Sequence, residues 1–268
     1  MIRNDKKIIN EYDFKWKQVK KLFSKIYSGN FLTDQKKYYK KVITKQKKKL
    51  INSDVYFYNN KICSYNINKI YQIRYDYINL LILRKIIKFD EIVDLGSGYG
   101  ERMLMLKPYL KSNTKIYLGE FTNSGIQAQK YLIKKYKFKN IISFLFDYND
   151  LEKKYSFKLK NPIFTTFQSI EQITNLKENF LKNLKKKFKI NKIHFLHLEP
   201  VGFQLNKYDK FDKLSKNYNI RNAYNQNLIS LIKKSSVKNF KIEKDIYTIV
   251  DKKNEIKKSC LSLITYNF

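Results

Sequence analysis

Hydrophobic and polar positions follow two different patterns along the chain, with a change near residue 88. Before it, apolar residues recur at helical spacing on a lysine-rich background, which predicts helices over residues 5 to about 51 and 70 to 87. The first stretch contains Ser28-Gly29-Asn30, a turn signal that divides it into two helices. Residues 52 to 68 lack this spacing and are expected to be irregular. Because no linker rich in proline or glycine follows, residues 1 to 88 are predicted to form a helical cap packed on the remainder, with Trp16 as its core anchor.

After residue 88, short apolar runs alternate with longer amphipathic stretches. The runs predict strands beginning at residue 92 and over 115–120, 140–146, 161–167, 192–198, 240–250 and 259–267; the amphipathic stretches predict helices over 101–110, 125–136, 173–188 and 222–234. This alternation is typical of an α/β fold with a mostly parallel sheet covered by helices on both faces. The last two strands are separated only by a polar turn, so they are expected to form an antiparallel C-terminal hairpin. The predicted domain therefore spans residues 89 to 268 and contains seven strands.

The most informative stretch is residues 92–100, Ile-Val-Asp-Leu-Gly-Ser-Gly-Tyr-Gly. A short apolar run ends in Asp94 and is followed by glycines at 96, 98 and 100. Glycine permits positive φ and a close approach of a ligand to the backbone, and the helix that follows presents free N–H groups. The stretch therefore predicts a buried strand that turns sharply into a helix beneath a bound ligand.

Composition limits the possible partners and compartments. The formal charge of +33 favours nucleic acid, but only five of the 56 basic residues are arginine, the better phosphate ligand, and the abundance of Lys, Ile, Asn, Tyr and Phe matches AT-rich codons. Nucleic acid is thus the less favoured partner. Cys63 and Cys260 show no metal-ligand or disulfide spacing, so no metal site is expected. The N-terminus has no apolar signal segment, which favours a cytoplasmic protein without membrane insertion. The oligomeric state is left open.

Polar side chains stand at the predicted carboxyl ends of the parallel strands. They are Asp94 with the glycines, Glu120, Asp147, Gln168 and Glu199. In open parallel sheets these ends converge on one crevice, where ligands bind. Glu120 follows the glycine turn by about twenty residues, the position of an acid that accepts hydrogen bonds from ribose hydroxyls. The ligand is therefore expected to contain a nucleoside.

A dinucleotide site requires G-x-G-x-x-G, and here the third glycine comes one residue early. With an acid two residues before the first glycine, residues 94–100 resemble the first motif of the class I S-adenosylmethionine-dependent methyltransferases, acid-x-G-x-G-x-G. The resemblance covers about residues 90 to 268 and implies a Rossmann-like fold, a seven-stranded sheet with one antiparallel strand, and S-adenosylmethionine as cofactor.

The resemblance also implies roles for individual residues. Asp94, Gly96, Ser97, Gly98 and Gly100 would line the methionine part of the cofactor, Glu120 would hold the ribose hydroxyls, Phe121 would pack on adenine, Asp147 would meet its amino group beside Tyr148, and Gln168 would complete the site. Residues 169–173 look like the x-L-E-H-[IL] sequence of many small-molecule members, with Gln172 in place of histidine. This departure leaves the presence of a functional base there open.

The implied reaction is methyl transfer to oxygen or nitrogen of a small polar acceptor. Such a displacement depends mainly on alignment, and a base is needed only where the acceptor loses a proton early. His197, Glu199 and Glu171 are the candidate bases. Arg74, beside Tyr75, is placed to reach the cofactor's carboxylate or an anionic acceptor, or to lie on the surface.

Two alternative functions are retained. The first is an RNA methyltransferase that uses the basic surface, although residues 167–170, Phe-Gln-Ser-Ile, lack the [ND]-P-P-[FYW] motif of enzymes that methylate base amino groups. The second is an inactive adenosylmethionine-binding partner subunit.

Overall fold

The computed structural model describes residues 5–50, 55–58, 61–64, 67–151, 155, 157–205, 210–250 and 256–268. Side chains are not described at some positions inside these ranges, among them Cys63, Arg74, Tyr75 and Cys260. The roles considered for these four residues therefore stay predictions. No helix in the described part of the chain is long and apolar enough to span a bilayer.

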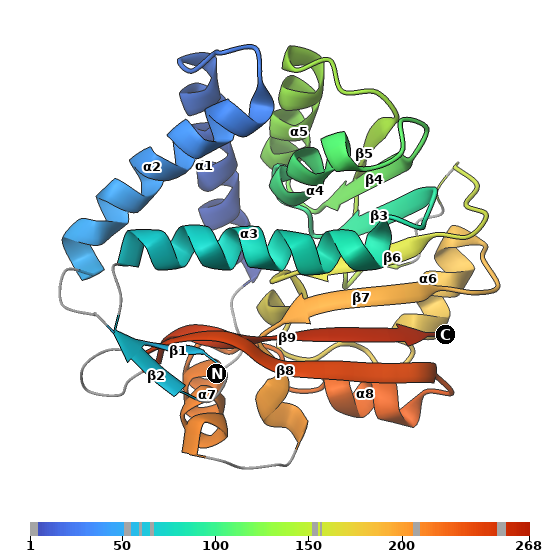
Figure 1. Cartoon of the computed structure of the whole chain (residues 1–268). Coiled ribbons are helices and arrows are strands. Elements are labelled where there is room, and N and C mark those ends of the chain that lie inside the picture. Colours follow the sequence, from blue (N-terminus) through green and yellow to red (C-terminus); the bar gives the residue numbers. More distant parts are fainter. Residues whose placement is uncertain are drawn as a thin grey trace.

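A single sheet runs through the molecule (Figure 1), with its strands in the order β2-β1-β8-β9-β7-β6-β3-β4-β5. Its strands are β1 (Val55–Tyr58), β2 (Lys61–Ser64), β3 (Glu91–Leu95), β4 (Lys115–Glu120), β5 (Ile141–Leu145), β6 (Ile163–Phe167), β7 (His194–Glu199), β8 (Lys238–Val250) and β9 (Ile256–Asn267). The strands from β5 across to β7 pair in parallel, whereas β9 is antiparallel to both β7 and β8. Strands β3 to β9 thus confirm the predicted seven-stranded, mostly parallel, Rossmann-like sheet with an antiparallel C-terminal hairpin.

The strand order changes direction at β3, which lies between β4 and β6. From β3 the chain moves outward to β4 and β5 and then returns to add β6 and β7 on the other side. The loops after β3 and β6 therefore diverge and leave a crevice at their carboxyl ends, the usual ligand position in such sheets.

Helices pack on both faces of the sheet, which is why β3 is buried along its whole length. On one face Ile78, Ile82 and Ile86 of α3 (Ile67–Ile86) share a buried cluster with Ile92 and Leu196 of the strands. Figure 1 shows α3 lying across this face. On the opposite face, a second cluster joins the strands to α6 (Phe180–Phe188) and α8 (Leu228–Lys234).

The remaining helices surround the crevice and the sheet ends. They are α1 (Asp5–Ser24), α2 (Phe31–Leu50), α4 (Glu101–Leu106), α5 (Asn123–Lys135) and α7 (Lys210–Arg221), with 3-10 turns at Lys107–Tyr109, Ile170–Gln172 and Gly202–Leu205. The break predicted at residues 28–30 is confirmed. Asn30 accepts the Thr33 amide at 3.1 Å, and the Asp34 carboxylate accepts the Ser28 amide at 3.0 and 3.1 Å, so the turn between α1 and α2 is closed by side chains.

Four segments differ from the prediction, and one of them is the helix expected over 222–234, which starts only at Leu228. Residues 55–64, expected to be irregular, contain the antiparallel pair β1 and β2, and β1 also pairs with β8, so the sheet extends beyond the C-terminal hairpin. The helix expected from residue 173 starts only at Phe180, and α7 was not predicted. The division of the chain at residue 88 stays a prediction.

Candidate ligand-binding site

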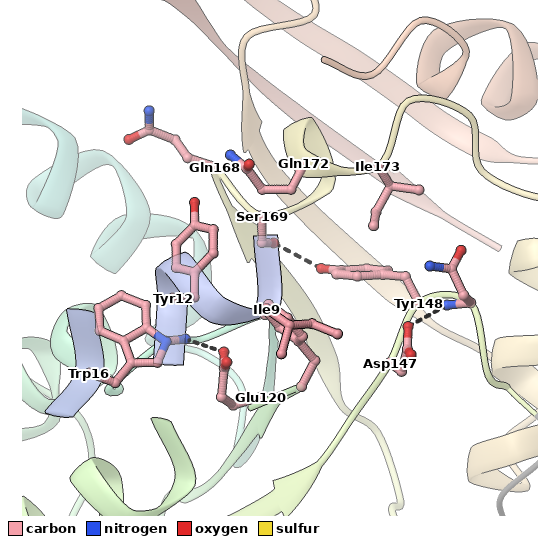
Figure 2. Close-up of a pocket in the computed structure, with 14 residues that line it drawn as sticks. Ile9, Tyr12, Trp16, Glu120, Asp147, Tyr148, Gln168, Ser169, Gln172 and Ile173 are labelled. Carbon is pink, nitrogen blue, oxygen red and sulfur yellow. Dashed lines mark hydrogen bonds between the residues drawn. The ribbon is translucent and has the colours of Figure 1, made fainter. Parts of the chain in front are cut away.

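A pocket of about 240 Å³ opens at the carboxyl ends of β3, β4, β5 and β6. It is lined by Ile9, Tyr12, Trp16, Gly96, Gly98, Glu120, Phe121, Asp147, Tyr148, Asn149, Gln168, Ser169, Gln172 and Ile173. Figure 2 shows that Ile9, Tyr12 and Trp16 come from helix α1, which crosses the pocket. Glu120 is the last residue of β4, and the other lining residues lie in the segments that follow the strands. The pocket therefore coincides with the crevice that the strand order defines.

The glycine turn after β3 forms one wall of this pocket. Gly96 and Gly98 both have positive φ, +69° and +58°, and both line the pocket. A Cβ on Gly96 would lie 2.5 Å from the Cβ of Ser169, so the loop after β6 can approach only because the side chain is absent. Gly100 is the N-cap of α4, away from the pocket, where a Cβ would lie 2.8 Å from Leu118.

Hydrogen bonds beneath the turn hold its shape. The amide and hydroxyl of Ser97 both donate to the Gly119 carbonyl, at 2.9 and 3.0 Å. The Gln129 amide nitrogen of α5 donates to the Gly98 carbonyl at 2.6 Å and to the Ser97 hydroxyl oxygen at 2.9 Å. Ser97 therefore supports the turn from below instead of lining the pocket.

Asp94 also lies beneath the turn. Its side chain is only 2% exposed and accepts a hydrogen bond from the Thr165 hydroxyl at 2.9 Å. Burial raises the pKa of Asp94 to about 7, against the Thr165 hydrogen bond and the charge of Arg102. It lies outside the pocket lining and links β3 to β6, and its expected contact with a ligand stays a prediction.

Glu120 ends β4 with its carboxylate at the pocket wall. One oxygen accepts the Gly98 amide at 2.9 Å, and the other accepts the Thr122 amide and hydroxyl at 3.0 and 2.7 Å. Burial raises the pKa of Glu120, whereas these donors and the Trp16 indole oppose that rise. The carboxylate joins the glycine turn to the start of α5 and is placed to accept hydrogen bonds from a ligand.

Two hydroxyl groups, one from the loop after β5 and one from the loop after β6, share a single backbone carbonyl as acceptor. The hydroxyls of Tyr148 and Ser169 each lie 2.8 Å from the Leu95 carbonyl and 2.8 Å from each other. Burial raises the pKa of Tyr148 well above its ordinary value, so its hydroxyl stays protonated and can donate. Nearby, Asp147 is exposed and accepts the Asn149 amide at 2.8 Å through one oxygen. These contacts fix the strand ends relative to one another.

The loop after β6 is held from below by Glu199. One carboxylate oxygen accepts the amides of Ser169 and Ile170 at 3.1 and 3.2 Å, and the other accepts the amide of Glu171 at 3.1 Å. Burial raises the pKa of Glu199 to about 7 in spite of these donors. Gln168, the residue before Ser169, has a φ of +54°. This left-handed conformation places Gln168 at the pocket.

The three candidate bases lie outside the pocket lining. His197 is 0% exposed, and its ring nitrogens pair with the Thr166 and Tyr266 hydroxyls at 2.8 and 2.9 Å. Burial lowers the pKa of His197 to about 3, so the ring is neutral. Glu199 is fully buried, and Glu171 accepts the Gln172 side-chain amide at 2.8 Å. The three residues thus lie in and beneath the β6 loop and β7, and their role as bases toward a methyl acceptor stays a prediction.

Seven predicted cofactor residues do meet at the pocket. They are Gly96, Gly98, Glu120, Phe121, Asp147, Tyr148 and Gln168. Trp16 packs against a buried cluster of the N-terminal helices, as predicted, but the sequence does not predict that Ile9, Tyr12 and Trp16 of α1 also line the pocket. The spacing of Ile9, Tyr12 and Trp16 predicts one apolar helix face and cannot distinguish a face that covers a pocket from one that covers a core. Ser169 and Gln172 also line the pocket, and the motif at residues 169–173 is the feature of the sequence that indicates their position there.

Comparisons with known proteins give likeness in structure alone. No family model matches the chain, and no curated protein matches its sequence. Among solved structures, a SAM-dependent methyltransferase from Aquifex aeolicus is similar at 12% identity and a TM-score of 0.44, over 76% of this chain and 99% of that one. The YcgJ protein from Bacillus subtilis is similar at 9% identity and a TM-score of 0.46, over 71% and 97% of the two chains. These likenesses are distant, so the assignment to the Rossmann-like α/β class rests on the strand order itself.

Proposed function

We propose that the protein is an S-adenosylmethionine-dependent methyltransferase that acts on oxygen or nitrogen of a small polar acceptor. The observation that carries the proposal is the convergence, in one pocket, of a tight glycine turn and two acids from successive strands. Gly96 and Gly98 follow β3, Glu120 ends β4, and Asp147 follows β5. Together with the acid-x-G-x-G-x-G sequence, this arrangement suits a nucleoside that bears an amino acid.

The residues present fit such a cofactor. Gly96 and Gly98 line the pocket and have no side chains, so the methionine part could approach their backbone, and Glu120 offers carboxylate oxygens to the ribose hydroxyls. Phe121 borders the same pocket for the adenine ring, and Asp147 has a carboxylate oxygen available to the adenine amino group. When bound, the cofactor would supply an electrophilic methyl group on a positively charged sulfur. The protein's share of the work is to align the acceptor and exclude water.

The opposite wall is proposed to hold the acceptor. It presents neutral polar groups from Gln168 and Gln172 beside the apolar side chain of Ile173. The Gln172 amide nitrogen donates to the Glu171 carboxylate at 2.8 Å, and its carbonyl oxygen is buried without a hydrogen-bond partner, so a shift of this side chain would let it accept from a hydroxyl or amino group. No histidine or lysine lines the pocket among the described residues. An amine acceptor fits this wall best, because it can attack through its lone pair without a strong base.

Calorimetric titration of the purified protein with S-adenosylhomocysteine and S-adenosylmethionine tests the proposal. We expect both to bind with one-to-one stoichiometry and NAD⁺ to give no heat, since the glycine spacing does not suit a pyrophosphate. Absence of binding at about 1 mM ligand, a concentration that reveals even millimolar affinity, would contradict the proposal.

Incubation with radiolabelled cofactor separates the acceptor classes. Label in a pool of small amines and alcohols would support the proposed acceptor. Label in bulk RNA that falls steeply with added salt would favour the RNA alternative. Cofactor binding without label in either pool would favour the inactive partner subunit.

A further inference from the structure

Helix α1 is held in place differently along its two halves. In the second half, Val19 and Phe23 are fully buried in a cluster with α4 and α5. The Lys135 ammonium of α5 donates to the backbone carbonyls of Phe23 and Ile26, the latter at 2.7 Å, and so caps the C-terminal end of α1. This half is fixed to the body of the protein.

The first half of α1 lies over the pocket instead. Tyr12 and Trp16 are half-buried and Ile9 is 45% exposed, and all three line the pocket (Figure 2). On the outer side of the same turn, Phe14 is 64% exposed. This half is less buried than the second half: Tyr12 contacts Phe121, and Trp16 packs against Tyr99 at the edge of the same cluster.

Trp16 occupies the part of the pocket nearest the glycine turn. A Cβ on Gly98 would lie 2.9 Å from the indole ring, so the ring rests directly on the backbone of the turn. The indole N–H points at the Glu120 carboxylate, and Figure 2 marks a hydrogen bond between the two groups. Glu120 already accepts the Gly98 and Thr122 amides at 2.9 and 3.0 Å, so its remaining acceptor positions are few.

A flat ring on Gly98 with a donor directed at Glu120 is also the chemistry expected of a bound nucleoside, whose hydroxyls donate to that carboxylate. The two cannot occupy the same position. The hydroxyls of a ribose can replace the indole N–H as donors to Glu120, because a carboxylate forms charge-assisted hydrogen bonds with either group.

We propose that the first half of α1 is a plug, in which Trp16 fills the ribose position of the ligand-free protein and must leave Glu120 before a nucleoside can bind. The identity of the ligand rests on the proposed function. The plug adds that the Trp16 side chain competes with this ligand and lowers the apparent affinity of the protein for it. Binding then requires the open arrangement of α1, and the apparent affinity is reduced by the fraction of molecules that are closed.

Trp16 is the only tryptophan of the chain, so its fluorescence reports on the plug directly. Titration of the unmodified protein with S-adenosylhomocysteine should shift the emission to longer wavelength as the indole moves toward water. Trp16→Leu should bind S-adenosylhomocysteine about tenfold more tightly in calorimetry if about a tenth of the unmodified protein is open. Trp16→Phe keeps a ring but lacks the N–H, so its affinity for S-adenosylhomocysteine should lie between those of the unmodified protein and Trp16→Leu. Phe14→Ala, on the outer face of the same helix, is the matched control and should leave the affinity unchanged.

The outcomes are distinct. If the unmodified protein binds and Trp16→Leu binds equally or more weakly, with circular dichroism showing both folded, the plug is overturned and the proposed function stands. An emission spectrum that stays constant while calorimetry shows binding also overturns the plug. If neither the unmodified protein nor any variant binds S-adenosylhomocysteine, the proposed function fails and the plug fails with it.

Discussion

Two strands of the sheet end in glutamate, and the two carboxylates have different surroundings. Glu120 ends β4, where the chain turns at once into α5 with Thr122 as its N-cap, and this short connection leaves the carboxylate at the pocket wall. Glu199 ends β7, where the loop after β6 folds over it and directs three backbone amides at its oxygens. The comparison teaches that the neighbouring loop decides whether an acid at a strand end faces the pocket or supports a loop from beneath.

The largest expected effect comes from removing the loop support. Glu199→Ala would leave the amides of Ser169, Ile170 and Glu171 without their acceptor in the protein interior, which should lower the free energy of unfolding by about 3–5 kcal/mol. Urea denaturation followed by circular dichroism measures the loss. Glu178, which is exposed in the segment between β6 and α6, provides the control. Glu178→Ala should change the free energy of unfolding by less than about 0.5 kcal/mol. Equal stability of Glu199→Ala and the unmodified protein would show that the loop does not depend on this carboxylate.

The second effect concerns His197, the neighbour of Glu199 that is also removed from the pocket. Its pKa is lowered to about 3 by burial, whereas the unfolded chain has the ordinary value of 6.5. The folded state therefore binds fewer protons, and stability is lost as the pH falls from 6.5 toward 3, by about 2 kcal/mol at pH 5.

His197→Gln cannot titrate, so it isolates this contribution. We expect the stability difference between the unmodified protein and His197→Gln to shrink by about 2 kcal/mol between pH 7.5 and pH 5, measured by urea midpoints at each pH. A difference that stays constant with pH would mean that His197 reaches solvent and titrates normally, and would favour its role as a base.

The sequence predicts an element of the fold correctly where the local residue pattern by itself allows only one kind of structure. Strand β3 and the glycine turn were predicted because an apolar run followed by alternating glycines allows few structures. The sequence does not predict β1 and β2, although residues 55–58 are Val-Tyr-Phe-Tyr, because a two-stranded pair is marginal by itself and β1 joins the sheet by pairing with residues 248–250 of β8, far along the chain.

The site was predictable in part for the same reason. The strand order brings Glu120 and Asp147 to the pocket, and this order can be inferred from the alternation of strands and helices. The buried positions of His197 and Glu199 were not predictable, because they depend on how the loop after β6 folds over β7. Trp16 was assigned to a core because helical periodicity identifies a buried face and not what that face covers.

The smallest effect sharpens the comparison on the ligand side. Glu120→Gln keeps the size of the side chain and one acceptor oxygen, but it removes the charge that strengthens hydrogen bonds from the ribose hydroxyls. We expect S-adenosylhomocysteine to bind about 5- to 30-fold more weakly, or about 1–2 kcal/mol, in calorimetry. Glu178→Gln, an exposed change of the same chemistry, should bind as the unmodified protein does. An unchanged affinity of Glu120→Gln would mean that Glu120, like Glu199, only supports a loop, because its carboxylate would then serve the Gly98 and Thr122 amides alone.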